Sequence, residues 1–228
     1  MDIAVIKIGG SILYDNDLKL NVDFLRKIIH WFQNQDDYAS VVFVTGGGRL
    51  SRFLLNQVKE DINSDSPKHR VGIKVSRVNA IMFFGLFNDN EVEYFESTSE
   101  LCASIKKGKK GALIGGVLEG WSTDMVAASI ACDLGVKEVK KISNIDYIYS
   151  SDPYKYEDSE PFETLTWEKY IKLFHEQIGY KHKPNMSAPI DIECSLFCKE
   201  KDIAFRVSGG ELTSDVVDLL NSGTLVSK

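Results

Sequence analysis

Five short apolar segments recur along the chain, and each has the length of a buried strand. Runs of about four to eight apolar residues between polar or turn-forming residues are typical of strands that are covered on both faces. The segments are residues 2–8, 40–45, 111–114, 138–143 and 203–207. Stretches with a helical spacing of apolar residues separate them, so the sequence predicts strands that alternate with helices.

The intervening helices are recognised by apolar stripes and by the glycines at which they end. The segments with a clear stripe are 22–33 and 70–87. Further helices are predicted over 124–134, which stops at Gly135, and over 214–221, which stops before Gly223. This alternation predicts an α/β protein, a three-layer α/β/α sandwich around a central, mostly parallel open sheet.

Two polar segments interrupt the pattern without dividing the chain. Residues 60–69 and 150–162 hold three of the five prolines and are predicted to be exposed loops. With 228 residues, the sequence is expected to form a single domain over residues 1–228.

Composition narrows the range of partners. The net charge of −6 argues against nucleic-acid polymers and anionic membranes, because both require a broad basic surface. The apolar runs are far shorter than the roughly 20 residues that cross a bilayer, and the first residues lack the features of a signal peptide, so we expect a cytoplasmic protein. The cysteines Cys102, Cys132, Cys194 and Cys198 form no CxxC pair and lie in helical, apolar segments. They are expected to be buried thiols, and no metal site is predicted.

Two glycine clusters follow predicted strands, where an open α/β sheet binds its ligands. The first lies in VIKIGGSIL (5–13) and follows Lys7, and the second lies in VVFVTGGGRLSR (41–52) and precedes Arg49 and Arg52. Glycines let backbone N–H groups approach phosphate oxygens, and a helix that starts in the second cluster adds its positive end. Either cluster alone is more often a tight turn. The two together, each beside a cation, predict a phosphate-binding site.

Two further segments also follow strands, but neither is specific by itself. In GWSTDMVAA (120–128), Ser122 or Thr123 caps a helix and Asp124 lies in its first turn, which ordinary helix capping explains. ISNIDYIYSSDP (142–153) has the asparagine and aspartate residues of an ordinary turn.

Taken in order, five motifs resemble those of the amino-acid kinase superfamily, and within it the UMP kinases of archaeal type. They are KIGGS, TGGGRLSR, STDMVAA, SNIDYIYSSDP and PIDIECSLFCKEKDIAFRVSGG. The resemblance extends over essentially the whole chain, and its order is more specific than any single motif. It implies an ATP-dependent kinase with an acceptor-binding half of about residues 1–135 and an ATP-binding half of about 136–228. It also implies ATP and Mg²⁺ as cofactors and a homo-oligomer, often a hexamer built of dimers.

The resemblance further implies which residues bind ATP and which support the reaction. The ATP-binding set is Lys7, Gly9, Gly10, Ser11, Gly48, Arg52, Ser143, Asn144, Tyr149 and Asp152. The catalytic set is Lys7, Asp124 and Arg52. Catalysis of phosphoryl transfer consists mainly of positioning and charge stabilisation, so Lys7 and Arg52 act as cations while Asp124 orients them without taking a proton. Mg²⁺ is expected to bind chiefly to ATP oxygens and water.

The acceptor side departs more from the family pattern. The implied acceptor residues are Gly47, His69, Trp121, Ser122 and Thr123. His69 stands about where the family has an aspartate for the ribose, and residues 117–121 are more apolar and more acidic than usual. Tyr147 replaces a glycine that the family prefers, which implies that, if this position needs a positive φ, either Tyr147 is strained or the turn differs.

Three functions therefore remain open. The first is a UMP kinase that forms UDP, and the second is a kinase of the same fold for another small phosphate or carboxylate, such as an isoprenoid phosphate or a cofactor precursor. The third is a nucleotide-binding or storage protein without turnover. Lys7 and Asp124 favour the two kinases, and the altered segment 117–121 favours the second of them. Lys181 and Lys183 form either a solvated basic loop or a phosphate contact, and the sequence does not decide between them.

Overall fold

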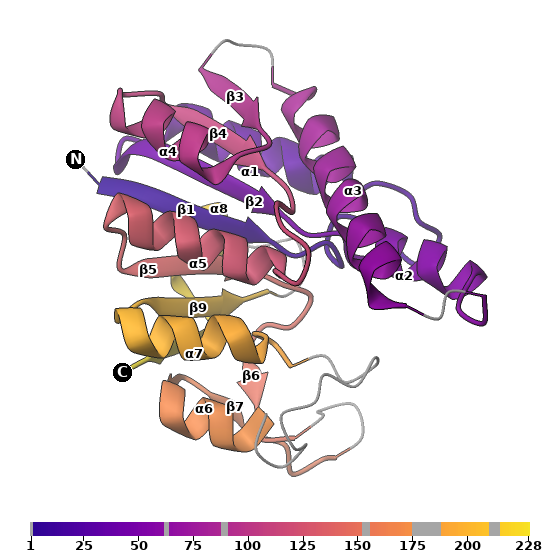
Figure 1. The fold of residues 1–228 in the computed structure, drawn as a ribbon. Coiled ribbons are helices and arrows are strands. Elements are labelled where there is room, and N and C mark those ends of the chain that lie inside the picture. The colour runs from indigo at the N-terminus through magenta and orange to yellow at the C-terminus, as the bar shows by residue number, and fades with distance from the viewer. Residues whose placement is uncertain (1, 62–63, 88–90, 152–155, 175–187, 210–214) are drawn as a thin grey trace.

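A computed structural model describes residues 2–61, 64–87, 91–151, 156–174, 188–209 and 215–228 (Figure 1). The strands of the main sheet are β1 (Asp2–Ile8), β2 (Tyr38–Thr45), β3 (Val92–Phe95), β4 (Gly111–Ile114), β5 (Glu138–Ile142), β8 (Thr164–Thr166), β9 (Ala204–Ser208) and β10 (Thr224–Ser227). Within the described residues they form an eight-stranded sheet in the order β3-β4-β2-β1-β5-β9-β10-β8. β10 runs antiparallel to β9, while the other neighbouring strands of this sheet are parallel. A separate antiparallel ladder joins β6 (Ile148–Tyr149) to β7 (Pro161–Phe162).

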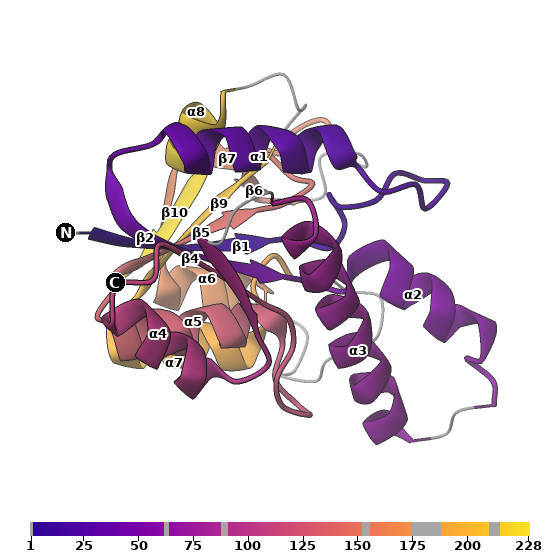
Figure 2. The same cartoon turned by 90° about the horizontal axis from the view of Figure 1, so that it is seen from above.

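Helices cover both faces of the main sheet (Figure 2). One face is covered by α1 (Val22–Asn34) and α8 (Val216–Asn221), and the other by α4 (Thr98–Lys106), α5 (Thr123–Leu134), α6 (Trp167–Phe174) and α7 (Ile192–Lys201). The helices α2 (Gly48–Gln57) and α3 (Asp65–Phe84) extend beyond the carboxyl ends of β1 and β2. The predicted three-layer α/β/α fold is confirmed. In the described part of the chain, no helix combines the length and apolar character that crossing a bilayer requires.

All five predicted strands are present with bounds within about two residues of the prediction, and Gly135 ends α5 with a φ of 74° as expected. The prediction of a loop over 60–69 is wrong in its second half, because α3 begins at Asp65. Its first turn tolerates Pro67, since the N–H groups there lack intrahelical partners in any case. The helix predicted over 70–87 therefore starts earlier, and it ends at Phe84.

The alternation of side chains along β1 and β5 positions the site. In β1, Val5 packs into the core beneath α5, whereas Ile6 and Ile8 pack into the core beneath α1. Because side chains alternate along a strand, Lys7 points to the α5 side with Val5. Lys141 lies opposite Lys7 in the parallel register of β1 and β5, and it shares a face with buried Val139. Two lysines on neighbouring strands therefore point toward α5.

The junction between β1 and β5 divides the sheet. Strands β1 to β4 lie on one side of it, and β5, β9, β10 and β8 lie on the other. Open α/β sheets bind ligands at such a switch in strand order, outside the carboxyl ends of the strands. The two lysines lie near the carboxyl ends of the two strands at this junction.

Candidate active site

One carboxylate bridges the two lysines beneath the first turn of α5. Lys7 Nζ lies 3.0 Å from Asp124 Oδ1, and Lys141 Nζ lies 2.5 Å from Asp124 Oδ2. All three side chains are at most 10% exposed. Two ammonium groups and one carboxylate leave a net positive charge in a nearly dry site, which suits an anionic ligand.

Burial and the neighbouring charges shift the pKa values of this cluster. Burial lowers the pKa of Lys7 from 10.5 to about 8, and the attraction of Asp124 offsets only part of that effect. Burial by itself would raise the pKa of Asp124, but the ammonium groups of Lys141 and Lys7 outweigh burial and lower it. At neutral pH Asp124 is therefore a carboxylate, and Lys7 is a cation close to losing its proton.

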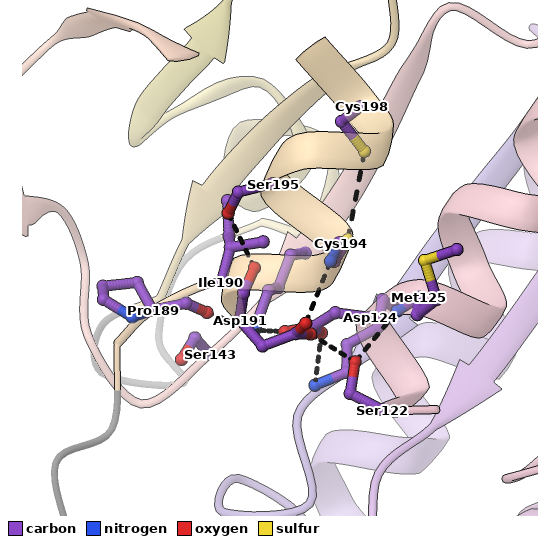
Figure 3. A network of polar contacts seen from close by, with 12 residues as sticks. Ser122, Asp124, Met125, Ser143, Pro189, Ile190, Asp191, Cys194, Ser195 and Cys198 are labelled. Carbon is purple, nitrogen blue, oxygen red and sulfur yellow. Dashed lines mark hydrogen bonds and ion pairs between the residues drawn. The ribbon is translucent and has the colours of Figure 1, made fainter. Parts of the chain in front are cut away.

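Two helix caps that are hydrogen-bonded to each other fix the start of α5. Ser122 Oγ accepts a hydrogen bond of 3.0 Å from Met125 N and donates one to the carboxylate of Asp191 (Figure 3). Asp191 in turn caps α7 by accepting a hydrogen bond of 2.9 Å from Cys194 N. The capping role expected of Ser122 is confirmed, and the structure adds that this cap joins the starts of two helices.

The two glycine loops lie against each other next to this cluster. A Cβ atom on Gly10 would lie 2.3 Å from Gly48 N, and one on Gly48 would lie 1.9 Å from the carbonyl carbon of Gly10. Gly48 also has a φ of +55°, which side chains other than that of glycine rarely adopt. A Cβ on Gly46 would lie 3.5 Å from Lys7 Nζ. The loops therefore need glycine in order to approach each other, and the second loop lies beside Lys7.

Two consecutive hydrogen bonds through a buried side chain of α3 support the second loop. Asn79 Nδ2 donates a 2.7 Å hydrogen bond to Gly46 O, and Tyr14 OH donates one of 2.7 Å to Asn79 Oδ1. Asn79 is 2% exposed. The loop is thus held in place before any ligand arrives.

The start of α2 is open to an anion. Its first turn follows Gly47, and among the described residues no side chain caps it. Two nearby cations contact the first loop: Arg49 Nε donates to Ser11 O at 3.2 Å, and Arg52 donates to Ser11 Oγ at 3.0 Å. Uncapped N–H groups and guanidinium groups beside a glycine loop form a phosphate-binding arrangement.

The model of the amino acid kinase family matches residues 2–207 of the chain. The chain belongs to this family. The resemblance found in the sequence is therefore confirmed at the level of the family.

Curated relatives of this amino acid kinase include uridylate kinases. The uridylate kinase of Staphylothermus marinus is 28% identical over 227 residues, which cover 97% of each chain, and that of Thermococcus sibiricus is 25% identical over 225 residues. Among solved structures, the uridylate kinase of Archaeoglobus fulgidus has a TM-score of 0.76 and 21% identity, with 99% of this chain and 100% of that chain covered. The UMP kinase of Ureaplasma parvum has a TM-score of 0.77 and 21% identity. At these identities the two structures demonstrate a shared fold.

The implied ATP-side residues of this kinase fall into three places. Lys7, Gly10 and Gly48 lie at the contact between the loops, and Arg52 lies over Ser11. Gly9 N donates to Ile142 O at 2.8 Å, and Ser143 N donates to Ser208 O at 2.7 Å. The first bond joins the first loop to the end of β5, and the second joins the turn after β5 to the end of β9. In this turn Asn144 is exposed, and Tyr149 of β6 is half-buried. Asp152, Lys181 and Lys183 lie outside the described residues.

The strain implied at Tyr147 is absent. Among the described residues, the non-glycine positions with positive φ are Leu18 and Asp202. Tyr147 N donates instead to Asp146 Oδ1 at 3.0 Å, and Tyr149 OH donates to the same oxygen at 3.0 Å. Strain is thus excluded at Tyr147, which leaves the second alternative, a turn that differs from the glycine turn.

The implied acceptor residues are less closely grouped. Thr123 lies beside Gly46, and Gly47 lies against Ser51 and Gly72. Trp121 is half-buried and packs against the core beneath α5. His69 is exposed on the second turn of α3.

The start of α3 is nevertheless tied to the altered segment 117–121. Ser66 Oγ donates to Glu119 at 2.8 Å, and Arg70 lies 3.7 Å from Glu119. Glu119 therefore links the two parts of the sequence that depart from the family pattern.

Lys141 is the main site residue that sequence reasoning missed. The neighbouring Lys140 points away and donates to Glu138 and to Leu220 O, at 3.1 and 3.0 Å. The signal was present in the alternation of β5, because Lys141 shares a face with Val139 in a strand expected to be buried. The carboxylate of Asp124, which compensates for the cost of burying the Lys141 charge, lies in another part of the sequence.

The pKa of Lys7 predicts an alkaline loss of activity. As the pH rises through about 8, Lys7 loses its proton in the free enzyme. We expect kcat/KM for ATP to fall in this range, because this constant reports the ionisation of the free enzyme. The pH–rate profile measures the effect, and a flat profile from about pH 7 to about pH 10 would contradict it.

Stability should change in the opposite direction. The unfolded chain keeps this proton up to about pH 10.5, while the folded chain releases it near 8. The unfolded state thus binds more protons in this window, and the contribution of Lys7 to stability rises with pH. Urea unfolding of the wild type relative to Lys7→Met isolates this contribution and separates loss of catalysis from alkaline unfolding.

Proposed function

We propose that this protein is an ATP-dependent kinase that transfers the γ-phosphoryl group of ATP to UMP and forms UDP. The observation that carries the proposal is the buried group of Lys7, Asp124 and Lys141 at the contact between two glycine loops. The names of relatives that align over 97% of the chain support UMP as the acceptor.

Each residue has a defined part in the proposed reaction. A phosphate oxygen of UMP attacks the γ-phosphorus, the bond from this phosphorus to the bridging oxygen breaks, and ADP leaves. Lys7 and Lys141 provide cations for the charge on the migrating group, and Asp124 holds both in place. Arg52 and the N–H groups of the glycine loops hold phosphate oxygens. The protein provides positioning and charge and needs no covalent intermediate.

The site fits ATP with a metal ion that arrives on the nucleotide. Both carboxylate oxygens of Asp124 face ammonium groups, so this residue is engaged as an ion-pair partner. Within the described residues, no group of three or more histidine, cysteine or acidic side chains is arranged to hold a metal. Mg²⁺ bound with ATP would supply charge neutralisation for the phosphates, beside the cations of Lys7, Lys141 and Arg52.

The order of the strands supports a division of labour between the two halves of the chain. We assign acceptor binding to about residues 1–135, which include β1 to β4, and ATP binding to about 136–228, which include β5, β9, β10 and β8. Lys7 and Lys141 come from different halves and meet at Asp124. The reacting phosphates are accordingly expected to meet at the junction between β1 and β5.

A different acceptor is the second candidate, and the segment 117–121 favours it. Leu118 is 50% exposed, and Glu119 contacts Ser66 and lies near Arg70 at the start of α3. A pocket built to hydrogen-bond a uracil base rejects other acceptors, whereas an apolar one cannot reproduce those bonds.

Calorimetry with a non-hydrolysable ATP analogue present distinguishes the two acceptors. UMP is expected to bind with a Kd below about 50 µM, roughly 6 kcal/mol of binding, and AMP is the matched control. A Kd for UMP above about 1 mM would contradict UMP as the acceptor and favour another small phosphate.

We also propose that the protein is a homo-oligomer. Large apolar side chains are exposed on and next to the two helices that extend beyond the sheet, namely Phe53 and Leu54 on α2, Val58 directly after it, and Val78, Ile81 and Met82 on α3. Exposed apolar surface of this kind is typical of a face that is covered in an assembly. Light scattering after gel filtration tests this proposal, and a monomer at micromolar concentration would contradict it.

A further inference from the structure

A short segment before α7, residues 189–191, contacts the reaction centre at two points. Lys141 Nζ donates a 2.5 Å hydrogen bond to Pro189 O. The carboxylate of Asp191 accepts the hydrogen bond from Ser122 Oγ, and Ser122 caps the helix that carries Asp124 (Figure 3). We call residues 189–191 the α7 entry segment. Its position helps to determine where both Lys141 and Asp124 lie.

Tyr170 of α6 holds the middle of the α7 entry segment. Its hydroxyl donates to Ile190 O at 2.9 Å and accepts from Ile190 N at 2.6 Å. Tyr170 and Ile190 are both fully buried. A buried backbone N–H or C=O that loses its partner destabilises the fold, so one hydroxyl that serves both groups is a strong local restraint.

The rest of Tyr170 is fixed by packing. Its ring packs edge-on against Trp167 at a centroid distance of 5.9 Å, and it packs against the ring of Phe174 in a tilted arrangement at 4.8 Å. Burial raises the pKa of the Tyr170 hydroxyl well above its usual value, so the hydroxyl keeps the proton that it donates to Ile190. A rigid ring thus presents a permanent donor and acceptor to the entry segment.

These contacts form two continuous paths from α6 to the reaction centre. One runs from Tyr170 through Ile190 to Pro189 O and Lys141, and the other runs through Asp191 and Ser122 to the first turn of α5. The helices α5, α7 and α6 lie side by side on the same face of the sheet (Figure 1). Tyr170 thereby restrains both partners of the buried pair Lys141–Asp124 without touching either.

We propose that Tyr170 is a positioning residue for phosphoryl transfer, which acts through residues 189–191 on Lys141 and on Asp124. This inference rests on the proposed function. The reaction depends on cations held to within a fraction of an ångström of their working positions, and a displacement of about 1 Å can cost on the order of 10²-fold in rate. Loss of the hydroxyl should weaken stabilisation of the transition state more than it weakens nucleotide binding, because the glycine loops and Arg52 bind the nucleotide.

Tyr170→Phe tests the proposal because it keeps the ring and removes the hydroxyl. We expect kcat to fall by about 10- to 100-fold, while KM for ATP and UMP changes by less than about twofold. The matched control is Ser40→Ala near the start of β2, which removes a buried hydroxyl and its 2.8 Å hydrogen bond to Lys109 O, outside the entry segment and away from Tyr170. The control is expected to lower stability but to keep kcat within about twofold.

Hydrogen exchange provides a readout that does not depend on turnover. The amides of Met125 and Cys194 are capped by Ser122 and Asp191, and we expect them to exchange faster in Tyr170→Phe than in the wild type or in Ser40→Ala. The inference is overturned if kcat is unchanged in Tyr170→Phe, if the control loses as much activity, or if these amides exchange equally in both variants. If the wild type phosphorylates no acceptor, the proposed function fails, and the exchange rates alone decide whether Tyr170 restrains the two helix starts.

Discussion

The Asp124→Asn variant is expected to lose at least about 10²-fold in kcat and to unfold more readily than the wild type. Without the carboxylate, two ammonium groups share a buried site with no opposite charge, and breaking a buried pair in this way costs about 3–5 kcal/mol. The attraction of Asp124 raises the pKa of Lys7, so its loss lowers that pKa below about 8. A smaller fraction of Lys7 is then protonated at neutral pH, while the glycine loops still bind ATP.

Three measurements test this outcome together: kcat, ATP affinity by calorimetry, and urea unfolding. The control is Asp133→Asn, which removes an exposed carboxylate from the same helix and should change stability by less than about 0.5 kcal/mol. An unchanged kcat would remove Asp124 from the reaction centre. Loss of ATP binding together with a destabilised helix would indicate that Asp124 serves only the start of α5.

The second large effect is expected from Gly48→Ala. The new Cβ would lie 1.9 Å from the carbonyl carbon of Gly10, and the φ of +55° is unfavourable for alanine. Strain of about 1–2 kcal/mol from the backbone and about 1–3 kcal/mol from overlap predicts a loss of about 2–5 kcal/mol in stability. The glycine loops must separate to admit the methyl group, so ATP affinity should fall as well.

Gly135→Ala is the matched control for that variant. Gly135 also has a positive φ, 74°, but a Cβ there would meet no atom within 4 Å. Its loss of about 1 kcal/mol should reflect backbone strain alone, with ATP affinity unchanged. Equal losses in the two variants, with ATP bound equally well, would mean that the contact between the loops is not needed for the site.

The sequence predicts those parts of the fold that local pattern determines. The segments 2–8 and 40–45 are apolar enough to be recognised as buried strands, and β1 and β2 form there. By contrast, β3, β8 and β10 are three or four residues long and mix polar with apolar residues. These strands form because they pair with strands that are distant in the sequence, and the local sequence pattern does not predict such pairing.

The same limit applies to the site. The glycine loops were predicted because glycine has a specific physical use, namely the close approach of backbones. Lys141 was missed because its partner Asp124 comes from another helix and its register with Lys7 depends on sheet topology. Tyr170 belongs to an amphipathic helix in which an aromatic residue is expected to serve packing alone. Its hydrogen bonds to Ile190 arise only from the tertiary arrangement.

The most direct test of the central claim is transfer of label from γ-labelled ATP to UMP in a single turnover. We predict that the label appears in UDP with the wild-type protein, and that Lys7→Ala lowers the rate of transfer by at least about 10²-fold while the fold is retained. A wild-type protein that binds ATP but leaves saturating UMP unlabelled would contradict the account, as would a Lys7→Ala variant that transfers label at the wild-type rate.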